Sequence, residues 1–289
     1  MTAATFDPLE AGQPVAVGAR AKRGRWNGPL VTGLVLFGLI VLCAVLAPVL
    51  TPYDPIAQNL DATFLPPGSA HHLLGTDSFG RDVLARLLYG ARVDLRVGVL
   101  AVVSPFIIGT LIGLIAGWFG GWLDTIIGRI VDIVIAFPFL VLVIALVFAM
   151  GPGTTSIYTA ITLVGWVAYC RIVRGQVLVA KEQEYAMAAK ASGLPTWRIL
   201  LRHLMPNVIL QAFIYSMSDI VLTLLAIVTL GFLGLGVPPP TPDWGTMIQD
   251  GQQFILTKWW LSTIPGLCVV LTGIALALIA DGIVDRTNR

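Results

Sequence analysis

The sequence has 289 residues, of which 56% are hydrophobic and only 12% are charged, and its formal net charge at pH 7 is +2. Soluble domains carry roughly 25% charged residues, so this composition excludes a soluble globular protein and indicates an integral membrane protein. The small net charge also argues against a nucleic-acid partner, because a nucleic-acid surface needs a clear excess of basic residues.

Six apolar segments are long enough to cross a bilayer, which takes about 20 predominantly apolar residues. In chain order they cover residues 30–50, 97–123, 125–150, 156–178, 205–236 and 259–280. The run GPGTT separates the third from the fourth, and Pro105, Pro138 and Pro265 are expected to kink the helices that contain them. The prediction is an all-α integral membrane protein with six transmembrane helices.

Most of the 18 lysines and arginines lie at the two chain ends or in the segment after the fourth span. Since basic residues concentrate on the cytoplasmic side of a membrane, both termini are predicted to be cytoplasmic. The expected layout is a cytoplasmic leader at 1–28 and a transmembrane domain at 29–289, with an extracytoplasmic segment at 51–95, a cytoplasmic region at 179–205 and an extracytoplasmic loop at 237–258. The first apolar run has no small-residue cleavage site, so no removable signal peptide is expected.

Small residues within the spans have a packing interpretation. Glycines recur every fourth residue along the second span, at Gly109, Gly113, Gly117 and Gly121, and such a bare face lets another helix approach closely. The three cysteines, Cys43, Cys170 and Cys268, are far apart in apolar runs and are expected to be buried free thiols.

Two polar blocks are predicted to lie on the outer side. In the first, Thr76, Asp77 or Ser78 could cap an interfacial helix that starts near Phe79, with an apolar stripe formed by Val83, Leu84, Leu87 and Leu88. In the second, the prolines of PPPTP favour extended backbone, and Trp244 suits the membrane interface.

The segment EYAMAAKASGLPTWRILLRHLMPN at 184–207 is predicted to form two short cytoplasmic helices joined by a tight corner. The first, at about 178–191, consists of good helix formers, Gly193 suits its left-handed C′ position, and Pro195 suits the first turn of the next helix. The second, at 195–204, is expected to end at Pro206 and to carry two arginines on one face. An ordinary solvated loop is the alternative, but loops between packed helices usually have about 2–8 residues. We therefore interpret the segment as a docking element, with Ala186, Ala188 and Ala189 as a low-profile surface.

Catalytic and energy-supplying motifs are not found in the sequence. None of the four lysines completes a P-loop, and the metalloprotease, C-x-x-C and nucleophile-elbow patterns do not occur. His71 and His72 diverge on any regular element, so no metal site is expected there. Asp219 is the one charge deep in a span, with Asp132 and Arg129 near the inner end of the third, whereas proton-coupled carriers usually string several ionisable residues through the membrane. A transporter built on this chain would take its energy from another subunit, and an intramembrane enzyme is disfavoured because Asp219 has no evident partner.

The cytoplasmic segment resembles a known motif. E-Y-x-x-A-A-x-A-x-G followed by L-R-H-x-x-P-N is similar to the EAA loop of permease subunits of binding-protein-dependent ABC importers of type I, in which this loop is the coupling helix that docks on the ATPase. Met187 stands where the motif usually has Glu, Met205 replaces the usual Leu, and Glu184 could supply the acid. The coupling residues implied are Glu184, Ala188, Ala189, Gly193, Arg198, Arg202 and Pro206, with Asn207 closing the motif.

The outer blocks resemble a subfamily. HLLGTDSFGRDVLARLLYGARVDLRVG at 72–98 and FLGLGVPPPTPDWGTMI at 232–248 are similar to signatures of dipeptide, oligopeptide and nickel permeases, and most of all to the C-type membrane subunits of dipeptide permeases. The resemblance implies an outer vestibule where a solute-binding protein docks, although a purely structural outer cap remains the alternative. The residues concerned are Gly75, Thr76, Asp77, Gly80, Arg81, Asp82 and Trp244.

The resemblance, which covers about residues 25–285, implies a pore subunit of an importer of dipeptides or short oligopeptides in the bacterial plasma (inner) membrane. Its expected partners are a homologous second permease subunit, two cytoplasmic ATPase subunits that use ATP and Mg, an extracytoplasmic binding protein and the lipid bilayer. The chain itself would be no enzyme and bind no cofactor. Asp219 would line the translocation path or pair across the subunit interface. Nickel, haem or glutathione as substrate, and a stand-alone channel or secondary carrier, are the alternatives.

Overall fold

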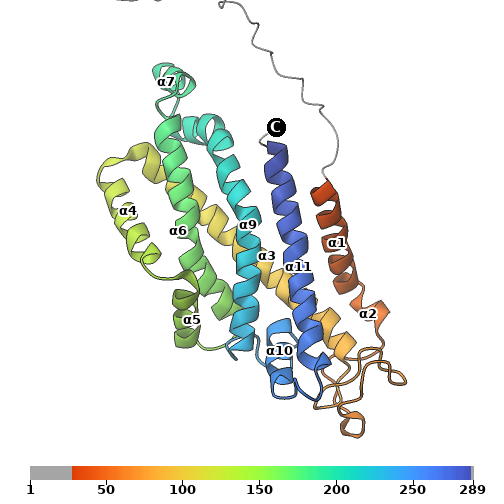
Figure 1. The fold of residues 1–289 in the computed structure, drawn as a ribbon. Helices are drawn as coiled ribbons and strands as arrows, with labels where there is room; N and C mark the ends of the chain where they lie inside the picture. The colour runs from red at the N-terminus through yellow and green to blue at the C-terminus, as the bar shows by residue number, and fades with distance from the viewer. Residues whose placement is uncertain (1–27, 288–289) are drawn as a thin grey trace, which may run out of the picture.

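A computed structural model describes residues 28–287 of the chain (Figure 1). Within this range the regular elements are helical, and no strand is formed beyond two isolated bridges. The elements are α1 (Gly28–Val45), α2 (Ala47–Leu50), the 3₁₀ turn η1 (Leu60–Ala62), α3 (Val83–Phe119), α4 (Gly121–Ile135), α5 (Phe139–Met150), α6 (Thr154–Ala180), α7 (Glu184–Ala191), α8 (Thr196–Arg198), the π-helix η2 (Ile199–Leu204), α9 (Met205–Phe232), α10 (Trp244–Gln252) and α11 (Trp260–Thr287). The predicted leader lies almost entirely outside the described residues.

Five stretches are long and apolar enough to cross a membrane: α1, α3, α6, the continuous run from α8 through α9, and α11. The pair α4 and α5 supplies a sixth crossing if the two are counted as one span, but they are bent by 89° at their junction. The expected kink at Pro138 is therefore a sharp break. Pro138 has φ −57° and ψ 128°, it has no N–H to donate, and its ring disfavours helical backbone at Phe137.

The arrangement of the helix ends shows which elements lie on the same side of the bundle. In Figure 1 the start of α1, the end of α11 and the whole of α7 lie at the top, while α10 and the segment between α2 and α3 lie at the bottom. The start of α1 and the end of α11 therefore lie on the same side, as an even number of crossings requires. Because the basic residues of the sequence predict that this side is cytoplasmic, we call the top the cytoplasmic side and the bottom the outer side.

Helix α3 differs from the prediction of an interfacial helix followed by a separate span. It is one helix of 37 residues with Pro105 inside it, about 55 Å long at 1.5 Å per residue, which exceeds the roughly 30 Å of a hydrocarbon core. Its N-cap is Asp82, whose side chain accepts the Ala85 N–H at 2.7 Å, and not a residue of 76–78. The helix can extend past the membrane because the outer segment and α10 cover its polar first turns.

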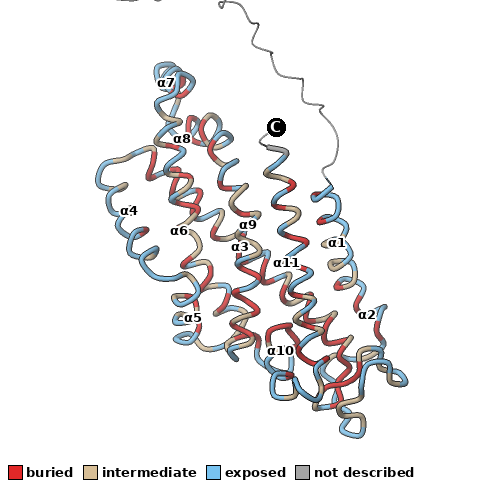
Figure 2. Tube along the Cα trace, viewed as in Figure 1, coloured by how far each residue is buried: buried red, intermediate tan, exposed pale blue. Residues whose placement is uncertain are grey.

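The centre of the bundle is the contact between α3 and α6. A Cβ atom on Gly109 would lie 2.3 Å from the Trp166 carbonyl oxygen, and similar clashes apply at Gly113 and Gly117. The predicted glycine face is thus a packing face for three of its four members. Gly121 is not part of it, because it begins α4 with φ +61° and faces open space. Buried residues gather along α3, α6 and the outer end, whereas α4 and α5 are largely exposed (Figure 2).

Cysteines follow the prediction in part. All three lie in described helices as free thiols. Cys170 is buried, but Cys43 and Cys268 are half-buried.

Candidate functional site

Helices α7, α8 and η2, at residues 184–204, form a helical hairpin on the cytoplasmic side. Its first helix, α7, ends at the corner predicted from Gly193. Gly193 has φ +71°, its N–H donates to the Lys190 carbonyl at 3.1 Å, and the Leu194 N–H donates to the Ala189 carbonyl at 3.4 Å. These two bonds form the Schellman pattern, in which a left-handed residue satisfies the last carbonyls of a helix. The first helix is shorter than predicted, because a turn at 181–183 separates it from α6.

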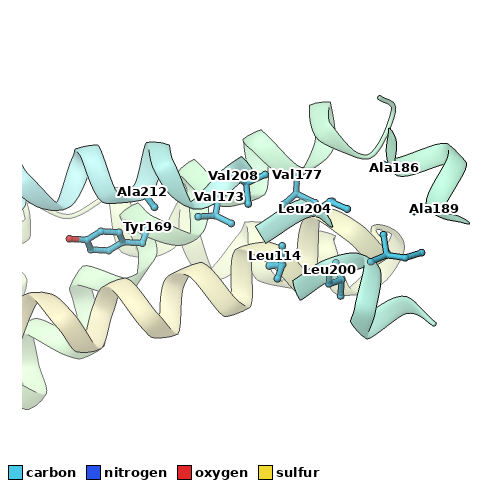
Figure 3. Close-up of a cluster of buried hydrophobic side chains, with 11 residues drawn as sticks. Leu114, Tyr169, Val173, Val177, Ala186, Ala189, Leu200, Leu204, Val208 and Ala212 are labelled. Carbon is cyan, nitrogen blue, oxygen red and sulfur yellow. The ribbon is translucent and has the colours of Figure 1, made fainter. Parts of the chain in front are cut away.

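The alanines of α7 do not form a single outward surface. Ala186 and Ala189 are buried in a cluster with Leu200 and Leu204 of η2 and with Val177 of α6 (Figure 3). The prediction of a low-profile docking surface is therefore wrong for these two residues. Small side chains there let α7 lie close to its own hairpin, and the free surface consists of other side chains, which are Glu184, Tyr185, Met187, Ala188, Lys190 and Trp197.

The second helix of the hairpin does not end at Pro206 as predicted. η2 runs directly into α9, and the N–H of Met205 donates to the Leu200 carbonyl, five residues back. A proline ring clashes with the carbonyl four residues before it, and the wider π turn accommodates Pro206 in the first turn of α9. Arg198 and Arg202 are exposed, and Arg198 lies over the Trp197 ring, 5.5 Å from its centroid.

Beside the hairpin, ionic contacts join the cytoplasmic ends of three helices. Arg174 of α6 donates to both carboxylate oxygens of Asp124 in α4, at 2.7 Å for the bond from Nη2. Lys181, just before α7, donates from Nζ to the Gly117 carbonyl of α3 at 3.1 Å. The base of the hairpin is thus tied to α3, and α4 is tied to α6.

On the outer side, two glycines fold the segment before α3. Gly75 and Gly80 have φ +77° and +69°, and a Cβ on Gly80 would lie 1.7 Å from the Asn59 carbonyl oxygen. Thr76 is fully buried. Its hydroxyl accepts the Leu65 N–H at 2.9 Å and donates to the Ala62 carbonyl.

An ionic cluster connects this segment to α10, with Asp77, Arg81 and Arg86 buried and Asp250 at its exposed edge. Asp77 accepts the Arg81 Nε–H at 2.6 Å, and Arg81 and Arg86 both approach Asp250 of α10, at 3.6 and 3.8 Å. Burial raises the pKa of Asp250 above its ordinary value, although the two arginines act in the opposite direction. Asp82, besides capping α3, lies 2.8 Å from His72 Nδ1.

Trp244 anchors the outer loop against α3. Its backbone N–H donates to Asp94 at 2.9 Å, and its indole N–H donates to the Leu87 carbonyl at 3.1 Å. The preceding Asp243 caps α10 by accepting the Thr246 N–H at 3.0 Å, and burial raises the pKa of Asp243. All seven outer residues singled out in the sequence are buried. They shape the outer cap, and their side chains offer no free surface to a partner.

Asp219 has an in-chain partner that sequence reasoning missed. The Tyr169 hydroxyl of α6 donates to Asp219 Oδ2 at 2.7 Å. Asp219 lines a cavity of about 520 Å³ between the α4–α5 bend, α6 and α9, with Tyr215 also in the wall. A tyrosine inside an apolar span needs a hydrogen-bond partner, which is the signal that could have suggested the pair. Elsewhere in residues 28–287, no three His, Cys, Asp or Glu side chains gather as metal ligands.

Two family models and several known proteins match the sequence of this chain. Residues 109–289 match the family model described as "Binding-protein-dependent transport system inner membrane component", and residues 25–67 match "N-terminal TM domain of oligopeptide transport permease C". The chain is 42% identical to the dipeptide transport system permease protein DppC of Escherichia coli K12, over 91% of this chain and 89% of that protein. It is 40% identical to the protein of the same name from Bacillus subtilis, over 92% and 83%. The di/tripeptide transport system permease protein DppC of Pseudomonas aeruginosa is 39% identical over 91% and 88%.

The first family match spans more than half of the chain, and the chain covers 83–89% of the length of the three relatives. Together with the all-helical membrane architecture, this places the protein in a bacterial inner membrane. The chain belongs to the family of inner membrane permease components of binding-protein-dependent transport systems.

Proposed function

We propose that this chain forms one half of the translocation pore of an ATP-driven, binding-protein-dependent importer of dipeptides or short oligopeptides. The observation that carries the proposal is the α7 hairpin, which projects beyond the spans on the same side as the start of α1 and the end of α11 (Figure 1). Three relatives that match most of the chain are named dipeptide or di/tripeptide permeases, which supports a short peptide as the substrate.

In this proposal the hairpin transmits force from a separate ATPase. The exposed face of α7, with Glu184 and Ala188, contacts the ATPase, while the opposite face is packed on η2 and α6 through Ala186 and Ala189. Because α7 packs on α6 and on η2, and η2 continues into α9, a displacement of α7 is transmitted to both α6 and α9. Closure of two ATPases on ATP and Mg would then switch the pore as rigid bodies move. The chain itself contributes no group to ATP hydrolysis.

The remaining partners follow from the two faces of the molecule. A homologous second permease would complete the pore against the exposed α4–α5 arm. An extracytoplasmic binding protein would dock on the outer cap, where Leu73, Phe79 and Leu256 are exposed. The buried residues around Asp77 and Trp244 hold that cap in shape, so they act on docking indirectly.

The experiment compares two exposed alanines on opposite sides of the membrane. In the complete importer reconstituted in proteoliposomes, Ala188→Trp on α7 should abolish ATP-driven dipeptide uptake and release the ATPase during purification. The matched control, Ala57→Trp in the outer segment before α3 and outside the α4–α5 arm, should retain the ATPase. Uptake driven by an ion gradient in vesicles that contain this chain without any ATPase would instead establish a secondary carrier and contradict the proposal.

A further inference from the structure

The cavity beside Asp219 has an unusual distribution of polarity. Among its lining residues, only Asp219, Tyr215 and Thr229 carry polar side-chain atoms, and the rest of the wall is apolar. The Thr229 hydroxyl is already used, since it donates to the Leu225 carbonyl at 2.7 Å. Asp219 is the single charged residue in the wall. The cavity has a volume of about 520 Å³, which falls within the roughly 300–1,000 Å³ of small-molecule sites.

The Asp219 side chain is held in place by a hydrogen bond but has no cationic partner in the described part of the chain. Tyr169 donates a hydrogen bond to Oδ2, and the Tyr169 ring is fixed edge-on between Phe106 and Tyr215. No lysine or arginine within residues 28–287 forms an ion pair with Asp219. A charged carboxylate in an apolar wall is costly unless a cation pairs with it, so a ligand that brings a positive charge to this cavity would find Asp219 as its counter-ion.

The chemistry of the wall narrows the kind of cation. One carboxylate flanked by phenols, with no histidine or cysteine in the lining, is a poor ligand set for a transition metal such as nickel. An organic ammonium group attached to an apolar body fits both the charge and the wall. The opening between the α4–α5 bend and α9 gives it a way in, because Phe137, Leu140 and Leu222 at this face are exposed.

We propose that Asp219 binds the α-ammonium group of the transported peptide, while the apolar wall of the cavity accepts the peptide's side chains. This inference rests on the proposed function, since it names a substrate contact of the same pore. Tyr169 acts as a positioning residue that orients the carboxylate through Oδ2 and leaves Oδ1 for the ligand. The permease then contributes to selectivity for a free N-terminus, in addition to any selection by the binding protein.

The test measures binding to the permease pair with its ATPases, purified in detergent without the binding protein. The probes are alanyl-alanine and its N-acetylated form, which differ in the ammonium charge. The wild-type complex should bind alanyl-alanine at least about tenfold more tightly than the acetylated form, as expected for a hydrogen bond to a charged group. Asp219→Asn should abolish this preference, Asp219→Glu should retain part of it, and Tyr169→Phe should weaken it while keeping the charge. The matched control, Asp281→Asn on α11 outside the cavity, should bind as the wild type does.

Several outcomes would overturn the inference. An equal preference in the wild type and Asp219→Asn would show that the carboxylate does not contact the ammonium group. If Asp219→Asn instead fails to co-purify with the second permease while Asp219→Glu succeeds, the carboxylate pairs across the subunit interface. ATP-driven dipeptide uptake by the wild type separates the two proposals. Uptake without an ammonium preference in binding overturns this inference alone, whereas no uptake at all contradicts the proposed function and this inference with it.

Discussion

Replacing Gly193 should uncouple the ATPase from the pore in a graded way. Gly193 has φ +71°, and a Cβ at this position would meet no atom within 4 Å. A side chain there costs nothing through clashes, so the whole penalty comes from the left-handed backbone. The series Asn, Ala and Val at this position therefore varies backbone strain with little change in packing.

The magnitudes follow from the known cost of left-handed backbone. Asn tolerates this region well, Ala pays about 1 kcal/mol, and a β-branched Val pays about 2–3 kcal/mol. α7 has only eight residues, too few to be stable as an isolated helix, so it depends on this corner and on the packing of Ala186 and Ala189. The corner should open about five times more often in the Ala variant and at least about thirty times more often in the Val variant.

Two measurements check the series. Hydrogen exchange of the Leu194 amide, which donates to the Ala189 carbonyl, reports opening of the corner. ATP-driven dipeptide uptake should fall in the same order, Asn above Ala above Val, while membrane insertion stays normal. The same substitutions at Gly175, an exposed α6 glycine with open space around it, serve as controls. Normal uptake by a well-expressed Gly193→Val variant would refute the coupling role, and equal exchange in all variants would refute the strain argument.

Three further predictions concern packing, pH and the α4 arm. In Gly113→Ala the added Cβ would lie 2.6 Å from a backbone oxygen of α6, so the free energy of unfolding, measured by thermal denaturation of the complex, should fall by about 1–3 kcal/mol. In Gly98→Ala the nearest neighbour of the added Cβ is 3.9 Å away, and the free energy of unfolding should not fall. Burial raises the pKa of Asp243, so the folded state binds this proton more readily than the unfolded chain, and stability falls as pH rises from about 4 through the folded pKa. Asp243→Asn keeps the cap on α10 and should therefore be more stable than the wild type at pH 7, with a flatter stability profile; a constant offset between the two across pH 4–7 would contradict this. Arg174→Gln should loosen α4 by about 1–2 kcal/mol because this part-exposed pair is charge-assisted, and a double-mutant cycle with Asp124→Asn should show a coupling energy of similar size.

The long-range pattern of the sequence predicts the fold well wherever hydrophobicity decides the outcome. The fourth and fifth spans were expected at 156–178 and 205–236 and are found at Thr154–Ala180 and Met205–Phe232. The corner at Gly193 was predicted for a local reason, since a glycine between a helical run and a proline has one favourable conformation. Both signals depend on residues close together in the chain.

Features that depend on distant contacts were not predictable in the same way. Pro138 indicates a kink, but an angle of 89° depends on what the arm packs against. The first turns of α3 contain Arg86 and Asp94, which look like interfacial charges in the sequence and are buried because α10 and the outer segment cover them. Tyr169 and Asp219 are fifty residues apart, and nothing local links a hydroxyl in one span to a carboxylate in another.

The dependence on distant contacts also explains why the motif residues of α7 separate into two roles. The pattern E-Y-x-x-A-A-x-A-x-G treats its alanines alike, yet Ala189 is buried against η2 while Ala188 is exposed. On a helix, neighbouring residues point about 100° apart, so adjacent alanines cannot both face the same partner. A small residue at Ala189 is needed for the hairpin to close on itself, and a small residue at Ala188 is needed for another protein to approach. Enlarging Ala189 should therefore destabilise the chain before any ATPase is present, whereas enlarging Ala188 should leave the isolated chain intact and affect only the assembled importer.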